Sequence, residues 1–525
     1  MEFPRVVLLN EPVLEFGQGQ TAAFVRDGLT LYGPVDSAKG GSSISVGAVG
    51  TKEGLDALST WLARVQTPVP GDGKSRPTFP GFGATFGTKI IPVSGAFLEI
   101  DPTTLRNLLG NTDRHQRTFA VVDTYIKAIG KYSKEEDVQP DLWFIVVSKE
   151  IENHCRPLGS SLRETRLDPE VRLSPSQAKL LLRGAEDKKK FLFDAMQRDH
   201  AEKSKQRKEI AKTYTFSPDF HDQLKVRMLG IGVTQVVSQE TLAIGPAWSP
   251  SEINVASDPE DEHIWERNDI AWSLLTTTYY KACGRPWKLH GIREGVCYLG
   301  LVFKQAPRED KPDYACCAAQ LHIDSGDGIV FRGGLGPWHT GNNEFHLSRR
   351  AAEVVAERTI GQYKLKVGKP PAELFVHGRA EFNDDEWSGF QTKCAEEGTK
   401  VTGIRIRKDP SLKLYSEQAY PPLRGTLVQI DSRTALLWTG GFVPRLGYSQ
   451  GIGQPNPLSL RVVRGDADIE QVAKDVFALT KVNYNACIFG DGLPVTIRFA
   501  NKIGSILTAA PTRDDHKLLP FRWYI

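Results

Sequence analysis

The chain has 525 residues, of which 40% are hydrophobic and 25% are charged, a composition typical of a soluble protein with two or three domains. No apolar run is long enough to cross a membrane, and the first residues lack the basic segment and apolar core of a secretion signal, so we expect a cytoplasmic location and no membrane partner. The 66 basic and 63 acidic residues leave a net charge of +3, which by itself gives no indication of a nucleic-acid partner. The seven cysteines include no CxxC pair and no spacing typical of zinc ligands.

The first half of the chain alternates predicted strands and helices. An apolar strand over 43–51 leads into a helix over 54–66, and two more helices precede a continuously apolar strand over 141–149. A run of that kind is typical of a strand buried on both faces of a parallel sheet. We therefore expect a Rossmann-like α/β domain over residues 1–285, with an N-terminal extension and a lysine-rich helical insertion near 157–215.

Polar side chains interrupt the apolar pattern late in this domain. The segment SPDFHDQLKVRMLGIGVTQVVSQ (217–239) predicts a helix capped by Ser217 and then a β-branched strand. His221 and Lys225 are four residues apart and therefore share one face of that helix. Gln235 is a polar residue within the strand.

Lys281 lies in the last turn of another predicted helix, over about 267–282. Taken singly, each of these polar residues has an ordinary structural role, such as a lysine that satisfies the last carbonyls of its helix. Taken together, near the end of a parallel strand, two ammonium groups, an imidazole and an amide are suitable donors for a terminal phosphate. We interpret them as a candidate phosphate site.

The second half, residues 286–525, has the element order of an RNase H-like domain: three strands, then helix, strand, helix and strand. These elements are expected at 295–303, 314–324, 328–333, 347–362, 373–380, 384–397 and 401–407. A nuclease of that fold needs several carboxylates to hold two divalent cations. The first strand contains no acid, and Arg379 lies at the end of the fourth, so we expect a domain that binds a nucleic-acid duplex without cutting it.

Several ordered motifs along nearly the whole chain resemble the short prokaryotic Argonautes, which consist of a MID and a PIWI domain. The motifs are NEPVLEFGQGQ…RDGLTLYGP, HDQLKVRMLGIGVTQVV, YYKACGRPWKL, GTLVQID…TGG…GIGQPNPLSL and LPVTIRFANKIGS. The resemblance implies a MID domain over residues 1–285 and a PIWI domain over 286–525.

The resemblance also implies a binding site, because the family holds the 5′-phosphate of a guide strand with a His/Tyr–Lys–Gln–Lys set. The matching residues are His221, Lys225, Gln235 and Lys281, with histidine in place of the commoner tyrosine. In relatives the C-terminal carboxylate shares a divalent cation with the phosphate, which implies Mg²⁺ at the carboxylate of Ile525.

Active members of the family carry an Asp–Glu–Asp–Asp/His tetrad. Val302 and Arg379 match the two aspartate positions and Asn501 the last position, while the glutamate position falls in the glycine-rich segment after residue 331 and has no clear match. The resemblance therefore implies that cleavage is lost and that the chain is not an enzyme. Three basic residues near a predicted strand end are candidate contacts to the guide or target backbone, or charges that protect an exposed edge strand: Arg405, Arg407 and Lys408.

The resemblance further implies partners. They are an RNA guide, a single-stranded DNA target and a second protein, whose APAZ domain is joined to a TIR or SIR2 NADase or to a nuclease. This effector is activated on target recognition, in defence against invading DNA. Two alternatives remain open on the sequence: a guided nuclease with unusual metal ligands such as Asp324 and Asp384, and a scaffold that binds only protein.

Overall fold

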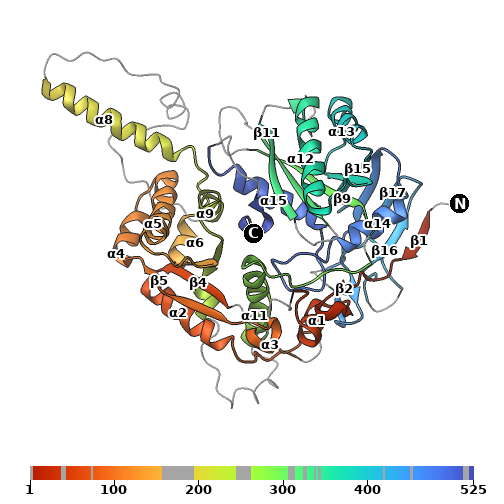
Figure 1. The fold of residues 1–525 in the computed structure, drawn as a ribbon, viewed down its shortest axis with the longest axis horizontal. Helices are drawn as coiled ribbons and strands as arrows, with labels where there is room; N and C mark the ends of the chain where they lie inside the picture. The colour runs from red at the N-terminus through yellow and green to blue at the C-terminus, as the bar shows by residue number, and fades with distance from the viewer. Residues whose placement is uncertain are drawn as a thin grey trace.

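The computed structural model describes residues 4–36, 43–72, 75–156, 194–243, 262–291, 293–305, 314–322, 328–335, 339–340, 344–417, 420–449, 453–511 and 519–525. Two large sheets, each with helices on both faces, make up a mixed α/β structure (Figure 1). Within the described ranges, no helix has the length and apolar character that a membrane span requires.

The first sheet consists of four parallel strands in the order β5–β4–β6–β7. The strands are β4 (Ile44–Gly50), β5 (Ile90–Glu99), β6 (Leu142–Val147) and β7 (Thr234–Ser238). Every residue of β6 is buried, which confirms the expected strand with two covered faces. The strand β5 was not expected, because Pro92 and Gly95 (φ +76°) interrupt its pattern and a register shift separates its two halves.

Alternate side chains of β6 pack on opposite faces of this sheet. Trp143 and Ile145 belong to one apolar cluster with α4, α5 and α9, whereas Phe144 and Val146 belong to another with α2 and α11. The helices of this half are α2 (Lys52–Arg64), α3 (Phe82–Phe86), α4 (Pro102–Leu109), α5 (Arg114–Glu135), α6 (Lys149–His154), α8 (Asp194–Thr213), α9 (Phe220–Met228), α10 (Gln239–Ala243) and α11 (Glu262–Lys281). The helix α8 extends away from the first sheet at the upper left of Figure 1 and forms part of the expected insertion, whose residues 157–193 lie outside the described ranges.

The helix α9 begins two residues later than expected. Its N-cap is Asp219, whose carboxylate accepts a hydrogen bond from the Asp222 amide at 2.9 Å. The predicted cap, Ser217, instead accepts a hydrogen bond from the Asp219 amide at 3.3 Å. Aspartate and serine are comparable caps, so the choice between them is set by the surrounding chain rather than by local preference.

The second sheet has ten strands in the order β1–β16–β17–β20–β15–β14–β9–β10–β11–β21. In chain order they are β1 (Arg5–Leu8), β9 (Val296–Gln305), β10 (Tyr314–His322), β11 (Gly328–Leu335), β14 (Glu373–Gly378), β15 (Lys400–Lys408), β16 (Thr426–Gln429), β17 (Thr434–Leu437), β20 (Leu458–Arg464) and β21 (Leu519–Pro520). The first three strands of the predicted domain are antiparallel neighbours, and β14 and β15 run parallel to β9. This is the arrangement that the predicted element order requires.

Helices cover both faces of this second sheet. The helices α12 (Arg349–Val367) and α13 (Asp384–Glu396) pack against Leu299 and Leu301, whereas α14 (Ile469–Ala478) and α15 (Val495–Leu507) belong to the cluster on the other face. The helix α15 approaches β9 very closely, because a Cβ atom built at Gly300 would lie 1.9 Å from the Thr496 carbonyl oxygen. Glycine at this position therefore permits the contact that fixes α15 on the sheet.

The N-terminal segment packs with the second sheet, although we expected it to extend the first domain. The strand β1 pairs with β16, and the carboxylate of Glu11 bonds the buried Arg424 and Lys481 at 3.1 and 2.8 Å. The remaining short elements are β2 (Leu14–Glu15), η1 (Gly17–Gly19), β3 (Thr21–Ala22), α1 (Val25–Tyr32), β8 (Lys288–Leu289), β12 (His339–Thr340), β13 (Glu344–Phe345), β18 (Phe442–Val443), β19 (Tyr448–Ser449) and η4 (Phe521–Trp523).

Candidate phosphate-binding site

Two lysines from distant helices meet at the start of β7. Lys225 lies in the last turn of α9 and Lys281 is the last residue of α11, and their Nζ atoms donate to the Thr234 carbonyl oxygen at 2.6 and 3.0 Å. Lys281 also donates to Oε1 of Gln235 at 2.6 Å. Lys225 also donates to the main-chain oxygen of Ile525, the last residue of the sequence, at 2.6 Å. The structure thus brings together four of the five residues expected at the phosphate.

Both ammonium groups are removed from water. The exposed fractions of Lys225 and Lys281 are 1% and 2%. Burial lowers the pKa of Lys225 to about 7, with a further lowering from the charge of Lys502. Burial also holds the pKa of Lys281 well below its usual range, and the charges of Lys225 and Lys502 act in the same direction. Among the described residues, no carboxylate side chain bonds either lysine. A buried positive charge without a carboxylate partner is costly, so this pocket is suited to an anion.

The chemistry of the donors supports the same conclusion. An ammonium group has three N–H donors, and the bonds described above use two on each lysine. The two amines also lie within hydrogen-bonding reach of each other, so each lysine has at most one donor left for a further acceptor. The Gln235 amide is held by Lys281 and by its own donation to the Val236 carbonyl oxygen at 3.0 Å, so its position is fixed before any ligand enters.

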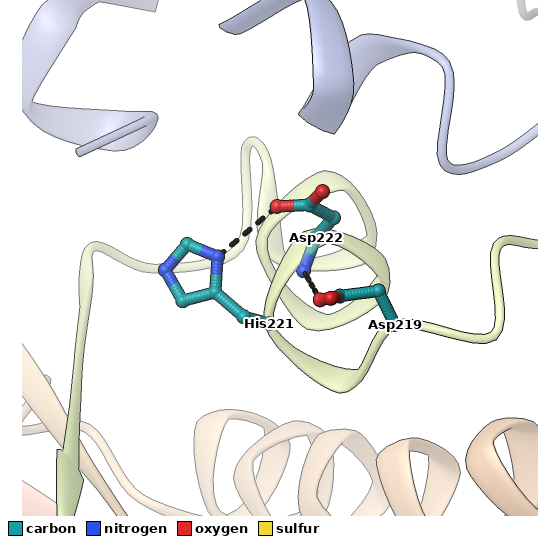
Figure 2. A group of neighbouring side chains, drawn as sticks. All are labelled: Asp219, His221 and Asp222. Atoms are coloured by element: carbon teal, nitrogen blue, oxygen red, sulfur yellow. Dashed lines mark hydrogen bonds and ion pairs between the residues drawn. The ribbon is translucent and has the colours of Figure 1, made fainter. Parts of the chain in front are cut away.

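His221 lies one turn before Lys225 on α9 and bonds Asp222 through Nδ1 at 3.1 Å (Figure 2). Burial lowers the pKa of His221 to about 4, and the charges of Lys225 and Lys502 act in the same direction. The imidazole is therefore neutral near pH 7 and offers a hydrogen bond rather than a positive charge.

Figure 2 also shows Asp219 beside His221 and Asp222, and one ligand atom from each could approach a common ion, since these atoms lie within 4.8 Å of one another. Both acids already have partners, because Asp219 caps α9 and Asp222 bonds the imidazole. The start of a helix is sufficient to explain this group.

Lys502 is a third lysine at this site, and our reading of the sequence did not select it. It lies on α15, which contacts α9, and its charge lowers the pKa of both Lys225 and Lys281. Lys502 stands directly after Asn501 in the FANKIGS motif and four residues after Arg498, so it shares a helix face with that arginine. That spacing was the available signal, but only the packing of α15 on α9 directs Lys502 to the other lysines.

The oxygens of this pocket that could ligate Mg²⁺ are hydrogen-bonded to lysines in this structure. A hard cation of this kind takes oxygen ligands, usually carboxylates, phosphates and water. The main-chain oxygen of Ile525 and the Thr234 carbonyl oxygen accept from lysines, and Oε1 of Gln235 accepts from Lys281. The other groups described here are ammonium groups, which cannot ligate a metal while they are protonated.

The positions matched to the catalytic tetrad lie near one another. Gly378 pairs with Leu301, so the next residues along these adjacent parallel strands are Val302, within β9, and Arg379, just after β14. Val302 is 3% exposed and Arg379 is exposed, and neither side chain can ligate a metal. Asn501 lies on α15, but its side chain is outside the described part of the structure, as is Asp324. Asp384 is an exposed side chain that pairs with Arg464 at 2.6 Å.

The three basic residues of β15 do not form a single patch. Arg405 pairs with Glu381 at 2.6 Å, and Arg407 donates to the Arg379 carbonyl oxygen at 2.5 Å. Because side chains alternate along a strand, Lys408 faces the opposite side of the sheet from Arg407. Only Lys408 keeps an ammonium group with no hydrogen bond or ion pair described for it in these ranges.

No family model and no curated protein matches the sequence. Among solved structures, the chain is similar to Clostridium butyricum Argonaute bound to a guide DNA and a 19-mer target DNA, with 14% identity, a TM-score of 0.58 and coverage of 97% of this chain and 53% of that one. It is also similar to A. aeolicus Argonaute (13% identity, TM-score 0.51, 99% and 55% covered) and to Marinitoga piezophila Argonaute in complex with a 5′-OH guide RNA (11%, 0.50, 99% and 59%).

The fold is Argonaute-like. At these identities the likeness concerns the fold alone, and the chain spans little more than half the length of each of these structures. Since the similarity extends over nearly all of this chain, both sheets belong to the shared architecture.

Proposed function

We propose that this chain is a guide-binding Argonaute of the short, MID–PIWI kind, which holds the 5′-phosphate of an RNA guide in the lysine pocket. The observation that carries the proposal is the pair of buried ammonium groups, Lys225 and Lys281, which converge on the Thr234 carbonyl oxygen without a carboxylate side chain. The Argonaute-like fold supports it, since solved neighbours include complexes with guide DNA or guide RNA.

The pocket would bind the phosphate through lysine side chains that are already positioned by their hydrogen bonds. The remaining N–H donors of Lys225 and Lys281 would bond phosphate oxygens, and charge-assisted bonds of this kind are about twice as strong as neutral ones. The neutral His221 would add a hydrogen bond or stack on the first base. The main-chain oxygen of Ile525 accepts from Lys225 and so orients its ammonium group.

Recognition of a single-stranded DNA target would follow from base pairing with the guide, while the protein contacts the backbone. We expect Lys408 to make such contacts, with smaller contributions from Arg405 and Arg407, which already have partners. Cleavage is not expected, because Val302 and Arg379 replace acids at neighbouring positions of two adjacent strands.

A protein that binds a target without cutting it needs a partner to act. In this proposal the partner is an effector with an APAZ domain, joined to a TIR or SIR2 NADase or to a nuclease, and the pair acts in the cytoplasm against invading DNA. The resemblance of the motifs supports this assignment.

The test compares guides that differ only in the 5′ group. We expect the intact chain to bind a 5′-phosphorylated RNA more tightly than the same RNA with a 5′-hydroxyl, as measured by fluorescence anisotropy. The double variant Lys225→Ala/Lys281→Ala should lose this preference, because it removes both phosphate-facing charges. Lys131→Ala, an exposed lysine on α5, is the matched control and should keep it. An unchanged preference in the double variant would exclude this pocket as the phosphate site.

A further inference from the structure

The strand β1 forms one edge of the ten-stranded sheet and lies at the right of Figure 1, on the far side of the molecule from α9 and the lysine pocket. It pairs with β16 on one side, and among the described residues no strand pairs with its other side. An edge of this kind presents unpaired main-chain N–H and C=O groups, to which a further strand can bond.

The hydrogen bonds of β16 show which residues of β1 face outward. The Leu9 amide donates to the Gly425 carbonyl oxygen at 3.0 Å, so the odd-numbered residues of β1 bond β16 in this antiparallel pair. The intervening residues of β16 bond β17 on its other side, which agrees with this alternation. The N–H and C=O groups of Val6 and Leu8 therefore point to the open edge.

The same two residues carry exposed apolar side chains. Val6 is 67% exposed and Leu8 is 56% exposed. They lie on the face of the sheet opposite to Val7, which packs against the apolar cluster that includes α14. On their own face they adjoin Val428, the partner of Val6 in β16, and Ile430, which follows two residues later and is 41% exposed. The open edge is therefore apolar as well as unpaired.

Edge strands usually carry features that prevent further pairing, such as a proline, a bulge or an outward charge. The edge strands β21 and β5 each contain a proline, Pro520 and Pro92. The charged residue of β1 is Arg5, which lies on the α14 face and pairs with Glu470 at 3.4 Å. It does not protect the edge, so β1 has the properties of a strand that accepts a partner.

We infer that this partner is a second copy of the chain, which pairs with β1 through its own β1 and joins two ten-stranded sheets into one. In the expected antiparallel register, Val7 lies opposite Val7 of the second copy. Val6 of each copy then bonds Leu8 of the other, which uses every outward N–H and C=O group of these residues. The exposed side chains of Val6 and Leu8 cover each other across the two-fold axis.

Other registers are less favourable. A shift by one residue would place the apolar faces of the two copies on opposite sides of the joined sheet. A shift by two residues would set Pro4, which has no N–H, opposite Leu8, or the polar Asn10 opposite Val6. Because the edge matches itself in this way, a second copy is favoured over a strand of another protein. The paired strands are short, so we expect an interface below the roughly 1,200 Å² of standard complexes and a dissociation constant in the micromolar range.

Sedimentation velocity of the full chain, from low to high micromolar concentration, tests for the dimer. Val6→Lys places a charge on the open edge and should keep the chain monomeric at every concentration, since lysine is a common guard of edge strands. Val138→Lys, the same substitution at a valine that is 62% exposed and lies before β6, is the matched control and should dimerise like the unmodified chain. Circular dichroism and the thermal midpoint show whether both variants are folded.

A cysteine at position 7 tests the register without a disruptive charge. The Cα atoms of Val7 and Val7 of the second copy would be about 4.5 Å apart, as in other non-hydrogen-bonded antiparallel pairs, and a disulfide can span that distance. Val7→Cys should therefore give a disulfide-linked dimer under mild oxidation. Arg5→Cys should not, because its counterpart would lie a full strand length away. Both carry Cys283→Ser, which removes an exposed native thiol.

Two results would overturn the inference. A chain that stays monomeric at high micromolar concentration would leave the edge of β1 to a strand of another protein. A dimer that persists in Val6→Lys, or that forms no disulfide through Val7→Cys, would have its interface elsewhere. Neither result bears on the proposed function, because the lysine pocket lies far from this edge and is tested by guide binding.

Discussion

Replacing Lys225 by methionine should stabilise the ligand-free protein while it removes phosphate binding. Methionine has nearly the same length and no charge, so it fills the same space in the core. The pKa of Lys225 is lowered from 10.5 to about 7 in the folded protein. That difference corresponds to about 5 kcal/mol of unfavourable free energy for the charged form, at about 1.4 kcal/mol per pH unit. The methionine also leaves the main-chain oxygen of Ile525 without its lysine donor, whereas the Thr234 carbonyl oxygen still accepts from Lys281, and the lost bond costs about 1–3 kcal/mol. A net stabilisation of about 2–4 kcal/mol at pH 7 is expected.

The pH dependence identifies the cause. Between pH 7 and 10.5 the unfolded chain holds a proton on Lys225 that the folded chain has lost, so the stability of the unmodified protein rises with pH in that window. The unfavourable free energy of burying the charged lysine acts in full below pH 7 and is absent above pH 10.5. The advantage of the methionine variant should therefore shrink as the pH is raised from 7 to 10.

Urea denaturation followed by tryptophan fluorescence measures this difference, with Lys131→Met as an exposed control that should change little. A 5′-phosphorylated RNA should stabilise the unmodified chain and have no effect on the variant. If Lys225→Met destabilises the protein by more than about 2 kcal/mol at every pH, the ammonium group is compensated in the free protein and the reasoning fails.

Two further predictions concern the framework. Arg424→Ala should cost at least about 1–3 kcal/mol in urea denaturation, because it removes one of the two buried cations that bond the Glu11 carboxylate, while Lys481 remains. It should also expose the chain near Glu11 to limited proteolysis, and unchanged cleavage would show that the N-terminal segment is held by other contacts. Gly300→Ala should destabilise the protein by at least about 1–3 kcal/mol, since its Cβ would meet the Thr496 carbonyl oxygen at 1.9 Å. Gly361→Ala on α12, where nothing lies within 4 Å, should be neutral or slightly stabilising, and equal thermal midpoints for both alanine variants would contradict the described packing.

The parts of the fold that could be predicted are those with a strong local pattern. The apolar run of β6 and the order of strands and helices after residue 295 were sufficient to predict the parallel sheet and the arrangement of β9, β14 and β15. The strand β1 was missed because its partner β16 is more than 400 residues away in the sequence, and no local periodicity encodes that pairing.

The sequence predicted some residues of the candidate site and missed others. Lys225 and Gln235 lie on one short helix–strand unit, so their proximity follows from the sequence, and Lys281 was added by motif. Lys502 could not be found by either route, because its role depends on how α15 packs against α9. The Asp219 cap shows the same limit on a smaller scale, since Ser217 was an equally good candidate locally.

The paths of the chain ends have a mechanical consequence. The polypeptide starts its first strand in the second sheet, crosses to the first sheet before Ile44, and returns to the second after Lys281. At the far end, Ile525 reaches back to Lys225. A hinge between two bodies normally turns about one linker, but here two covalent crossings span the boundary, together with the packing of α15 on α9 and the contact of Ile525 with Lys225. Separating the two sheets would therefore strain the polypeptide itself. A ligand bound in the lysine pocket lies where the two halves are least able to separate.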